Sequence, residues 1–265
     1  MALLLLDLGN TRLKWGLCAC APEDAQACAP AHGAMPLESI ETLAESVRMH
    51  AGAAGLRAAV GCAVAGAVAT MRVEAQLARL GLRCHWIHSL PQQCGVRNGY
   101  TTPSMLGADR WAALVGARRR HPGQAVLIIS VGTAVTIDCL AADGRFLGGV
   151  ILPGFGLMLR ALEMGTAGLK VPEGELREFP NNTSDALMTG GALAIAGAAR
   201  QMHVRLWRVE QRTPLVLLTG GAAPKLELAL GLAHDSVEHL VFDGLQSIAA
   251  ELGLASPLTA RSYKT

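Results

Sequence analysis

The chain contains 265 residues, of which 51% are hydrophobic, 17% charged and 4% aromatic, and its formal net charge is +2. This composition is typical of a globular protein with one large or two smaller domains, and it excludes a disordered chain. The small net charge gives no indication of binding to nucleic acid or to a polyanionic surface, so no nucleic-acid partner is expected.

The N-terminal segment MALLLLDLG is predicted to be a strand rather than a signal peptide. No basic region precedes the leucines, and Asp7 interrupts the apolar run. Four consecutive leucines are instead typical of a strand that is buried on both faces. No later stretch reaches the roughly 18 uncharged apolar residues that a membrane span requires, so no membrane association is expected.

The cysteines predict a cytoplasmic protein with reduced thiols. The chain has seven of them, an odd number, without an export signal. Cys18 and Cys20 are not expected to bind a metal, because no second pair at ligand spacing accompanies them. The other five are Cys28, Cys62, Cys84, Cys94 and Cys139.

The first half of the chain begins with a predicted hairpin. Residues 2–7 and 12–18 are expected to be strands around Gly9-Asn10, a pair that tolerates positive φ. Helices are predicted from apolar residues at helical spacing and from start signals such as Pro103. The expected elements that follow are a loop at 22–36, a helix at 37–51, a strand at 57–63, a helix at 67–80, a strand at 84–89 and a helix at 103–118.

The second half begins in the same way. Strands are predicted at 125–131 and 134–140 around Gly132-Thr133, and a third strand follows the turn Asp143-Gly144. The remaining expected elements are helices at 154–164 and 183–205, a strand at 214–218, a glycine turn with another helix, a strand near 237–242 and a helix at 243–252.

The two hairpin turns repeat one pattern. LDLGNTRLK at residues 6–14 and ISVGTAVTI at 129–137 share an apolar run, a short polar residue, any residue, a glycine and a small polar residue. Each half therefore begins with antiparallel strands around a glycine turn and then alternates helix and strand. We predict a duplicated α/β fold with domains at residues 1–120 and 121–265.

The repeated turns are candidate phosphate sites, because a glycine turn exposes backbone N–H groups without an obstructing Cβ. Asn10, Thr11 and Thr133 add short hydrogen-bonding side chains. Asp7 at the end of the first strand can hold Mg²⁺, and Lys14 can contact a phosphate as a point charge.

The alternative interpretation is that both turns are ordinary hairpins. Their equivalent positions in two halves, and a further glycine turn at Thr219-Gly220-Gly221, favour phosphate binding. The sequence contains neither the G-x-x-x-x-G-K-[ST] pattern of a P-loop nor the G-x-G-x-x-G pattern of a dinucleotide site.

Five motifs in the same order along the chain resemble type III pantothenate kinase, a family of the acetate kinase/sugar kinase/Hsp70/actin superfamily. They are DLGNTRLKW at 7–15, GYTTPSMLGADRW at 99–111, GTAVTID at 132–138, GGVILPG at 148–154 and NTSDALMTGG at 182–191. The resemblance implies two ribonuclease H-like domains of the actin-like ATPase fold with a nucleotide cleft between them. It also implies a homodimer that phosphorylates pantothenate from ATP, the first step of coenzyme A biosynthesis, and requires a monovalent cation.

The same resemblance implies roles for individual residues. Thr133 resembles the second ATP contact, and Thr183 a substrate contact that the family brings in at the dimer interface. Tyr100 and the run Gly107-Ala108-Asp109-Arg110 resemble the pantothenate site, with Asp109 as proton acceptor. The first phosphate motif, with Asp7 near the metal, consists of Asp7, Leu8, Gly9, Asn10, Thr11, Arg12, Leu13 and Lys14.

The chemistry of these residues agrees with phosphoryl transfer. Transfer to a primary hydroxyl needs positioned phosphates, Mg²⁺ and a carboxylate that orients the hydroxyl and accepts its proton. Asp109 provides such a base, and Arg110 beside it is suited to a substrate carboxylate. The alternative for this pair is an exposed ion pair on a helix surface.

Ser130 departs from the family pattern. The family usually has Asp at this position, where the carboxylate is associated with the monovalent cation. A hydroxyl offers neutral oxygens only, so binding of K⁺ or NH₄⁺ is expected to be weaker here. Two alternative functions are a regulatory, transcription-accessory protein with a silent site and another small-molecule kinase or phosphatase on the same fold.

Overall fold

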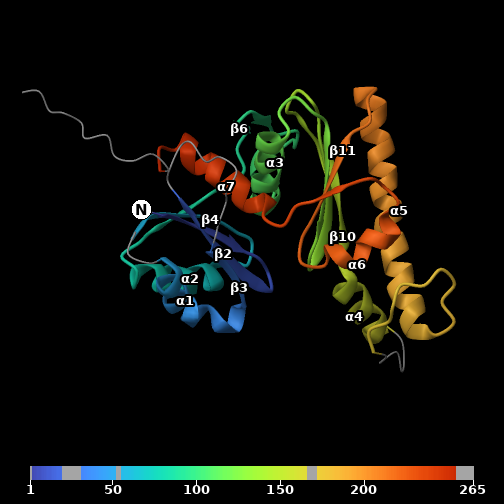
Figure 1. Cartoon of the computed structure of the whole chain (residues 1–265), viewed down its shortest axis with the longest axis horizontal. Helices are drawn as coiled ribbons and strands as arrows, with labels where there is room; N and C mark the ends of the chain where they lie inside the picture. The colour runs from blue at the N-terminus through green and yellow to red at the C-terminus, as the bar shows by residue number, and fades with distance from the viewer. Residues whose placement is uncertain (1, 20–30, 52–54, 166–171, 255–265) are drawn as a thin grey trace, which may run out of the picture. The chain divides into compact units, whose positions relative to one another are not determined.

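The computed structural model describes residues 2–19, 31–51, 55–165 and 172–254, which form two compact units (Figure 1). Unit 1 consists of the described residues within 1–94, 104–119 and 241–265, and unit 2 of those within 95–103 and 120–240. Each unit contains a five-stranded sheet with helices packed against it. The prediction of a duplicated α/β fold is confirmed.

The sheet of unit 1 has the strand order β3-β2-β1-β4-β5. Its central strand β1 pairs antiparallel with β2 and parallel with β4. The strands are β1 (Ala2–Leu8), β2 (Arg12–Ala19), β3 (Ala31–Pro36), β4 (Leu56–Ala63) and β5 (Cys84–Trp86). The helices are η1 (Leu37–Thr42), α1 (Leu43–Ala51), α2 (Ala67–Ala78), α3 (Ala108–Arg120) and α7 (Leu240–Glu251).

The leucines of β1 are buried on both faces of the sheet, as predicted. Leu4, Leu6 and Leu8 belong to the core that η1, α1 and α2 cover, and Leu3 and Leu5 on the opposite face are also buried. Asp7 shares the face of Leu3 and Leu5, because alternate residues of a strand point the same way. The pleat of β1 thus directs Asp7 away from the core under η1, α1 and α2.

Helix α7 clusters with unit 1, whereas the predicted ranges assign it to the second domain. Gly244 of α7 lies so close to α3 that an added Cβ would be 1.8 Å from the carbonyl oxygen of Ala112. Arg119 of α3 donates to the Gln246 side chain at 2.6 Å and to the Asp243 carbonyl at 3.3 Å. Because of these contacts, unit 1 is formed by segments that are separated in the sequence.

The sheet of unit 2 has the strand order β10-β9-β8-β11-β12. The long helix α5 and helix α6 pack against it (Figure 1) and bury a continuous apolar core. The strands are β8 (Val126–Val131), β9 (Ala134–Leu140), β10 (Phe146–Pro153), β11 (Leu215–Thr219) and β12 (Asp235–Ser236). The helices are α4 (Phe155–Gly165), α5 (Thr183–Glu210) and α6 (Ala223–Leu230).

Three predicted elements differ from the structure. The loop expected at 22–36 ends in a strand, β3 (Ala31–Pro36), and its residues 22–30 lie outside the described residues. The helix expected at 103–118 begins at Ala108, after two short strands, β6 (Gln92–Gln93) and β7 (Val96–Arg97), and a 3₁₀ turn, η3 (Pro103–Met105). The short strand expected near 237–242 lies earlier, as β12 at Asp235–Ser236, because α7 already begins at Leu240. The other predicted elements lie within a few residues of their observed bounds.

No helix in the described part of the chain is long and apolar enough to cross a membrane. The five described cysteines (Cys18, Cys62, Cys84, Cys94 and Cys139) are free thiols. Cys20 and Cys28 lie outside the described residues.

Candidate active site

Asp7 stands at the end of β1 in a row of three side chains that crosses three strands. Strand register places Lys14 of β2 on one side of it and Cys62 of β4 on the other. Lys14 Nζ donates to Oδ2 of Asp7 at 3.3 Å, and the Cys62 thiol donates to Oδ1 at 3.6 Å. The sequence predicts Asp7 and Lys14 for this site but does not single out Cys62.

The first turn presents its polar residues to solvent. Asn10, Thr11 and Arg12 are exposed, whereas Leu8 and Leu13 pair across the strands and pack into the core. The Gly9 N–H donates to the Arg12 carbonyl at 3.0 Å.

The backbone of the first turn does not use the left-handed region that its residues tolerate. Neither Gly9 nor Asn10 has positive φ. Glycine is favoured here by space instead, because an added Cβ would lie 3.3 Å from the Arg12 oxygen, which is a tight contact.

Asp109 lies in the first turn of α3, where its Oδ1 accepts the backbone N–H of Arg110 at 2.8 Å. An added Cβ on Gly107 would lie 2.6 Å from this oxygen, so glycine leaves room for the carboxylate. Burial, and to a lesser extent the charge of Asp7, raise the pKa of Asp109 above its usual value. The carboxylates of Asp7 and Asp109 are therefore electrostatically coupled within unit 1.

The pair Asp109 and Arg110 is not an exposed surface ion pair. Arg110 is 7% exposed, and Asp109 is half-buried. The helix that carries them is fixed at its start, since Ser89 donates to the Leu106 carbonyl at 2.7 Å and Trp111 donates to Gln93 at 3.2 Å. A half-buried acid and a buried guanidinium at one helix start can orient a hydroxyl and an anion.

The second turn is held by two glycines from elsewhere in unit 2. An added Cβ on Gly154 would lie 2.2 Å from the Gly132 oxygen, and one on Gly220 would lie 2.3 Å from the Val131 oxygen. The Gly154 N–H also donates to the Thr133 carbonyl at 2.9 Å. Thr133 itself is exposed at the tip of this turn.

Ser130 occupies the position that corresponds to Asp7. It aligns with Thr136 of β9 and Thr219 of β11, just as Asp7 aligns with Lys14 and Cys62. The second sheet thus presents a row of three hydroxyl residues where the first presents two charged groups and a thiol.

Tyr100 falls in unit 2, whereas residues 107–110 fall in unit 1. Its ring stacks on Phe146 with centroids 5.5 Å apart, and its N–H donates to Asn98 Oδ1 at 3.0 Å. Gly99 before it must be small, because an added Cβ would lie 1.9 Å from the Phe146 oxygen.

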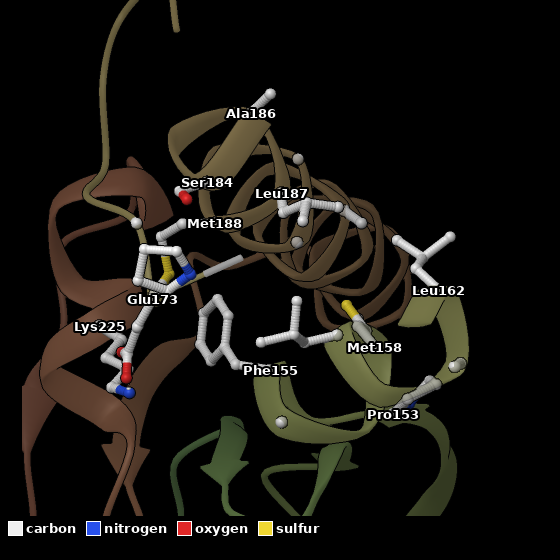
Figure 2. A pocket seen from close by; sticks show the side chains of 18 residues that line it. Pro153, Phe155, Met158, Leu162, Glu173, Ser184, Ala186, Leu187, Met188 and Lys225 are labelled. Carbon is white, nitrogen blue, oxygen red and sulfur yellow. Dashed lines mark hydrogen bonds and ion pairs between the residues drawn. The ribbon is translucent and has the colours of Figure 1, made fainter. Parts of the chain in front are cut away.

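Thr183 is the first residue of α5 and is exposed. Asn182 caps this helix by accepting the Asp185 N–H at 2.9 Å. Beside it lies a largely apolar cavity of about 570 Å³, lined by residues of α4, α5, α6 and the segment 172–174. Figure 2 shows Phe155, Met158 and Leu187 at this cavity, with the ion pair of Lys225 and Glu173 at one side.

The family model described as type III pantothenate kinase matches residues 3–205, which is most of the chain. The chain belongs to this family. All the predicted site residues, from Asp7 to Thr183, lie inside the matched segment.

Individual members of the family agree over nearly the full length. A type III pantothenate kinase from Leptothrix cholodnii is 51% identical and covers 95% of this chain and 97% of its own length. One from Methylibium petroleiphilum is 50% identical and covers 96% of this chain and 100% of its own length.

Solved structures show the same fold at low sequence identity. A conserved putative Baf family transcriptional activator from Campylobacter jejuni aligns with a TM-score of 0.58 at 18% identity, covering 94% of this chain and 98% of its own. A putative 2-dehydro-3-deoxygalactonokinase from Sinorhizobium meliloti aligns with a TM-score of 0.53 at 17% identity, covering 94% and 98%. These likenesses establish an actin-like ATPase fold.

Proposed function

We propose that the chain transfers the γ-phosphoryl group of ATP to pantothenate, giving 4'-phosphopantothenate in the first step of coenzyme A biosynthesis. The observation that carries this proposal is the half-buried carboxylate of Asp109 at the start of α3, whose pKa is raised by burial and by the charge of Asp7 beside a glycine turn. Family membership supplies the substrate, and the free thiols support a cytoplasmic location.

Asp109 would act as the general base. It accepts the proton of the substrate's primary hydroxyl as the oxygen attacks the γ-phosphorus and the bond to the β–γ bridging oxygen breaks. A raised pKa makes the carboxylate a stronger base than an ordinary aspartate, and the Arg110 N–H keeps its Oδ1 in place. Arg110 and Tyr100 would bind the pantothenate, the guanidinium facing its carboxylate.

Asp7 fits a site for Mg²⁺. The residue is 8% exposed, and its charge raises the pKa values of both Asp109 and Cys62. A hard cation bound to this carboxylate would offset that negative charge. Bound there, Mg²⁺ would offset the charge of the transferring phosphoryl group. The N–H groups and side chains of the first turn, and Thr133 in the second, would bind phosphate oxygens.

The chain would work as a homodimer in which Thr183 contributes to the pantothenate site of the partner copy. Residues that are exposed, with the half-buried Gly197 among them, recur every three or four positions along α5, which places them on one face of the helix. Gly190 and Gly197 on this face have no atom within 4 Å of an added Cβ, so a second helix could approach closely. The residues of the face are Thr183, Ala186, Gly190, Leu193, Gly197, Arg200, Val204 and Trp207.

An ATP-consumption assay of the purified protein tests the proposed function. We expect turnover with pantothenate and none with a panel of small hydroxy acids and sugars. Preference for a panel compound would identify another small-molecule kinase. Absence of turnover with every compound, while ATP or a partner still binds, would favour a regulatory protein.

A further inference from the structure

Cys62 is a buried thiol to which the reaction described above gives no task. It is 0% exposed, and its sulfur lies 3.6 Å from Oδ1 of Asp7. We propose that Cys62 is a positioning residue that orients the Asp7 carboxylate for Mg²⁺. This inference rests on the proposed role of Asp7 as the metal-binding carboxylate.

The contact follows from the pairing of β1 with β4. In their parallel register Asp7 lies opposite Cys62, so the two side chains leave the sheet next to each other on one face. Both residues stand near the ends of their strands, where β1 gives way to the first turn. The backbone of two buried strands therefore fixes the sulfur relative to the carboxylate.

The thiol is a donor in this environment. An ionised thiol would place a second negative charge 3.6 Å from the carboxylate oxygen in a buried site, so the sulfur keeps its hydrogen. An S–H group is a weak donor, but a buried carboxylate oxygen gains from any donor when water is excluded. Cys62 thus takes one acceptor position on Oδ1.

Among the described residues, the side-chain donors to Asp7 are Lys14 and Cys62. The two contacts are not expected to persist equally when a ligand binds. The Lys14 side chain is 47% exposed and is also the cation placed to contact a phosphate. If Lys14 turns to a bound phosphate, Asp7 loses its contact on Oδ2. The contact from Cys62 remains, since that side chain is enclosed in unit 1.

The test measures binding of ADP by calorimetry with Mg²⁺ and with EDTA, in the unmodified protein and in three variants. Cys62→Val keeps a buried apolar side chain of similar size but removes the donor, and Cys62→Ser restores a donor. Cys139→Ala is the matched control, because it removes another buried thiol, in unit 2, which lies 3.9 Å from the Met202 carbonyl.

We expect the gain in ADP affinity from Mg²⁺ to fall about tenfold in Cys62→Val, as for other residues that orient metal-binding carboxylates. Affinity in EDTA should be unchanged, and Cys62→Ser should recover most of the gain. An equal gain in Cys62→Val and Cys139→Ala would overturn the proposal. If Cys62→Val does not fold, Cys62→Ala takes its place in the same comparison.

The result is separable from the proposed function, because ADP binding requires no pantothenate. A protein that phosphorylates pantothenate but gains no ADP affinity from Mg²⁺ would refute the role of Cys62 and leave the kinase activity standing. A protein with the Mg²⁺ effect and its loss in Cys62→Val, but without turnover of pantothenate, would refute only the substrate.

Discussion

Some groups around Asp109 favour its charged form, and others disfavour it. The Arg110 N–H and guanidinium favour the charged form, whereas burial and the like charge of Asp7 disfavour it, and the latter effects dominate. A group whose folded-state pKa is raised destabilises the fold once pH rises above its unfolded value. At the pH where Asp109 must be ionised to act as the base, its charge therefore lowers the free energy of unfolding.

Asp109→Asn should separate these two effects. We expect kcat to fall about 10²–10⁴-fold, because the amide keeps the contact with the Arg110 N–H but cannot accept a proton. The melting temperature at pH 7–8 should rise, since a buried charge beside Asp7 is removed, and this difference should vanish at acidic pH where Asp109 is protonated. Steady-state kinetics and thermal unfolding across pH measure both. A kcat within a few-fold of the unmodified protein would remove Asp109 from the role of base.

Ser130 determines the expected response to monovalent cations. Neutral hydroxyls attract K⁺ less strongly than a carboxylate in a partly dry site, so activation by K⁺ or NH₄⁺ should be weak or require high concentration. Ser130→Asp should tighten it. Titration of activity with KCl, against choline chloride at equal ionic strength, measures the effect. Saturable activation at low millimolar KCl that is the same in both proteins would show that backbone carbonyls and phosphates hold the ion instead.

At the scale of elements, the second turn depends on glycines that approach it from two other elements. Gly154 follows β10 and Gly220 follows β11, and a side chain on either would collide with the backbone of residues 131–133. Gly220 also has φ of 101°, which disfavours any other residue.

Gly220→Ala should therefore displace this turn. We expect a loss of about 1–3 kcal/mol in the free energy of unfolding and weaker ATP binding. Gly221→Ala is the matched control for stability, because its added Cβ meets no atom within 4 Å. Denaturant unfolding of both variants measures the difference in their free energies of unfolding. Equal stability of the two would mean that the turn adapts to the extra methyl group.

Local patterns predicted most strands and helices, because alternation, helical spacing and turn residues are encoded within a few positions of one another. Asp7, Lys14 and Asp109 could be predicted from motifs for the same reason. The role of Cys62 could not be predicted in this way. Its contact with Asp7 depends on the parallel pairing of two strands, the two residues are 55 positions apart in the sequence, and no local turn specifies that pairing. The return of α7 to α3 is likewise set by a close approach of Gly244 that sequence spacing does not reveal.

For the molecule as a whole, the exposed face of α5 is the feature that a second copy would explain. Its residues repeat with alternating steps of three and four, the spacing of a helix-packing seam. Leu193 and Trp207 on this face are 53% and 44% exposed. Thr183 begins the same face, so a partner that packs along α5 would meet this residue.

Mixing two inactive variants tests whether Thr183 acts in the partner copy. Asp109→Asn removes the base, and Thr183→Arg fills the partner's substrate site. In a heterodimer of the two, one site carries both defects and the other carries neither, so activity should return. Random exchange gives half heterodimers with one intact site each, which predicts about a quarter of the unmodified activity.

Leu193→Glu in both variants should abolish the rescue by preventing association, whereas Leu228→Glu, on the exposed side of α6, should not. No rescue in a mixture shown by light scattering and tagged co-purification to contain heterodimers would place Thr183 in its own chain's site or outside the site altogether.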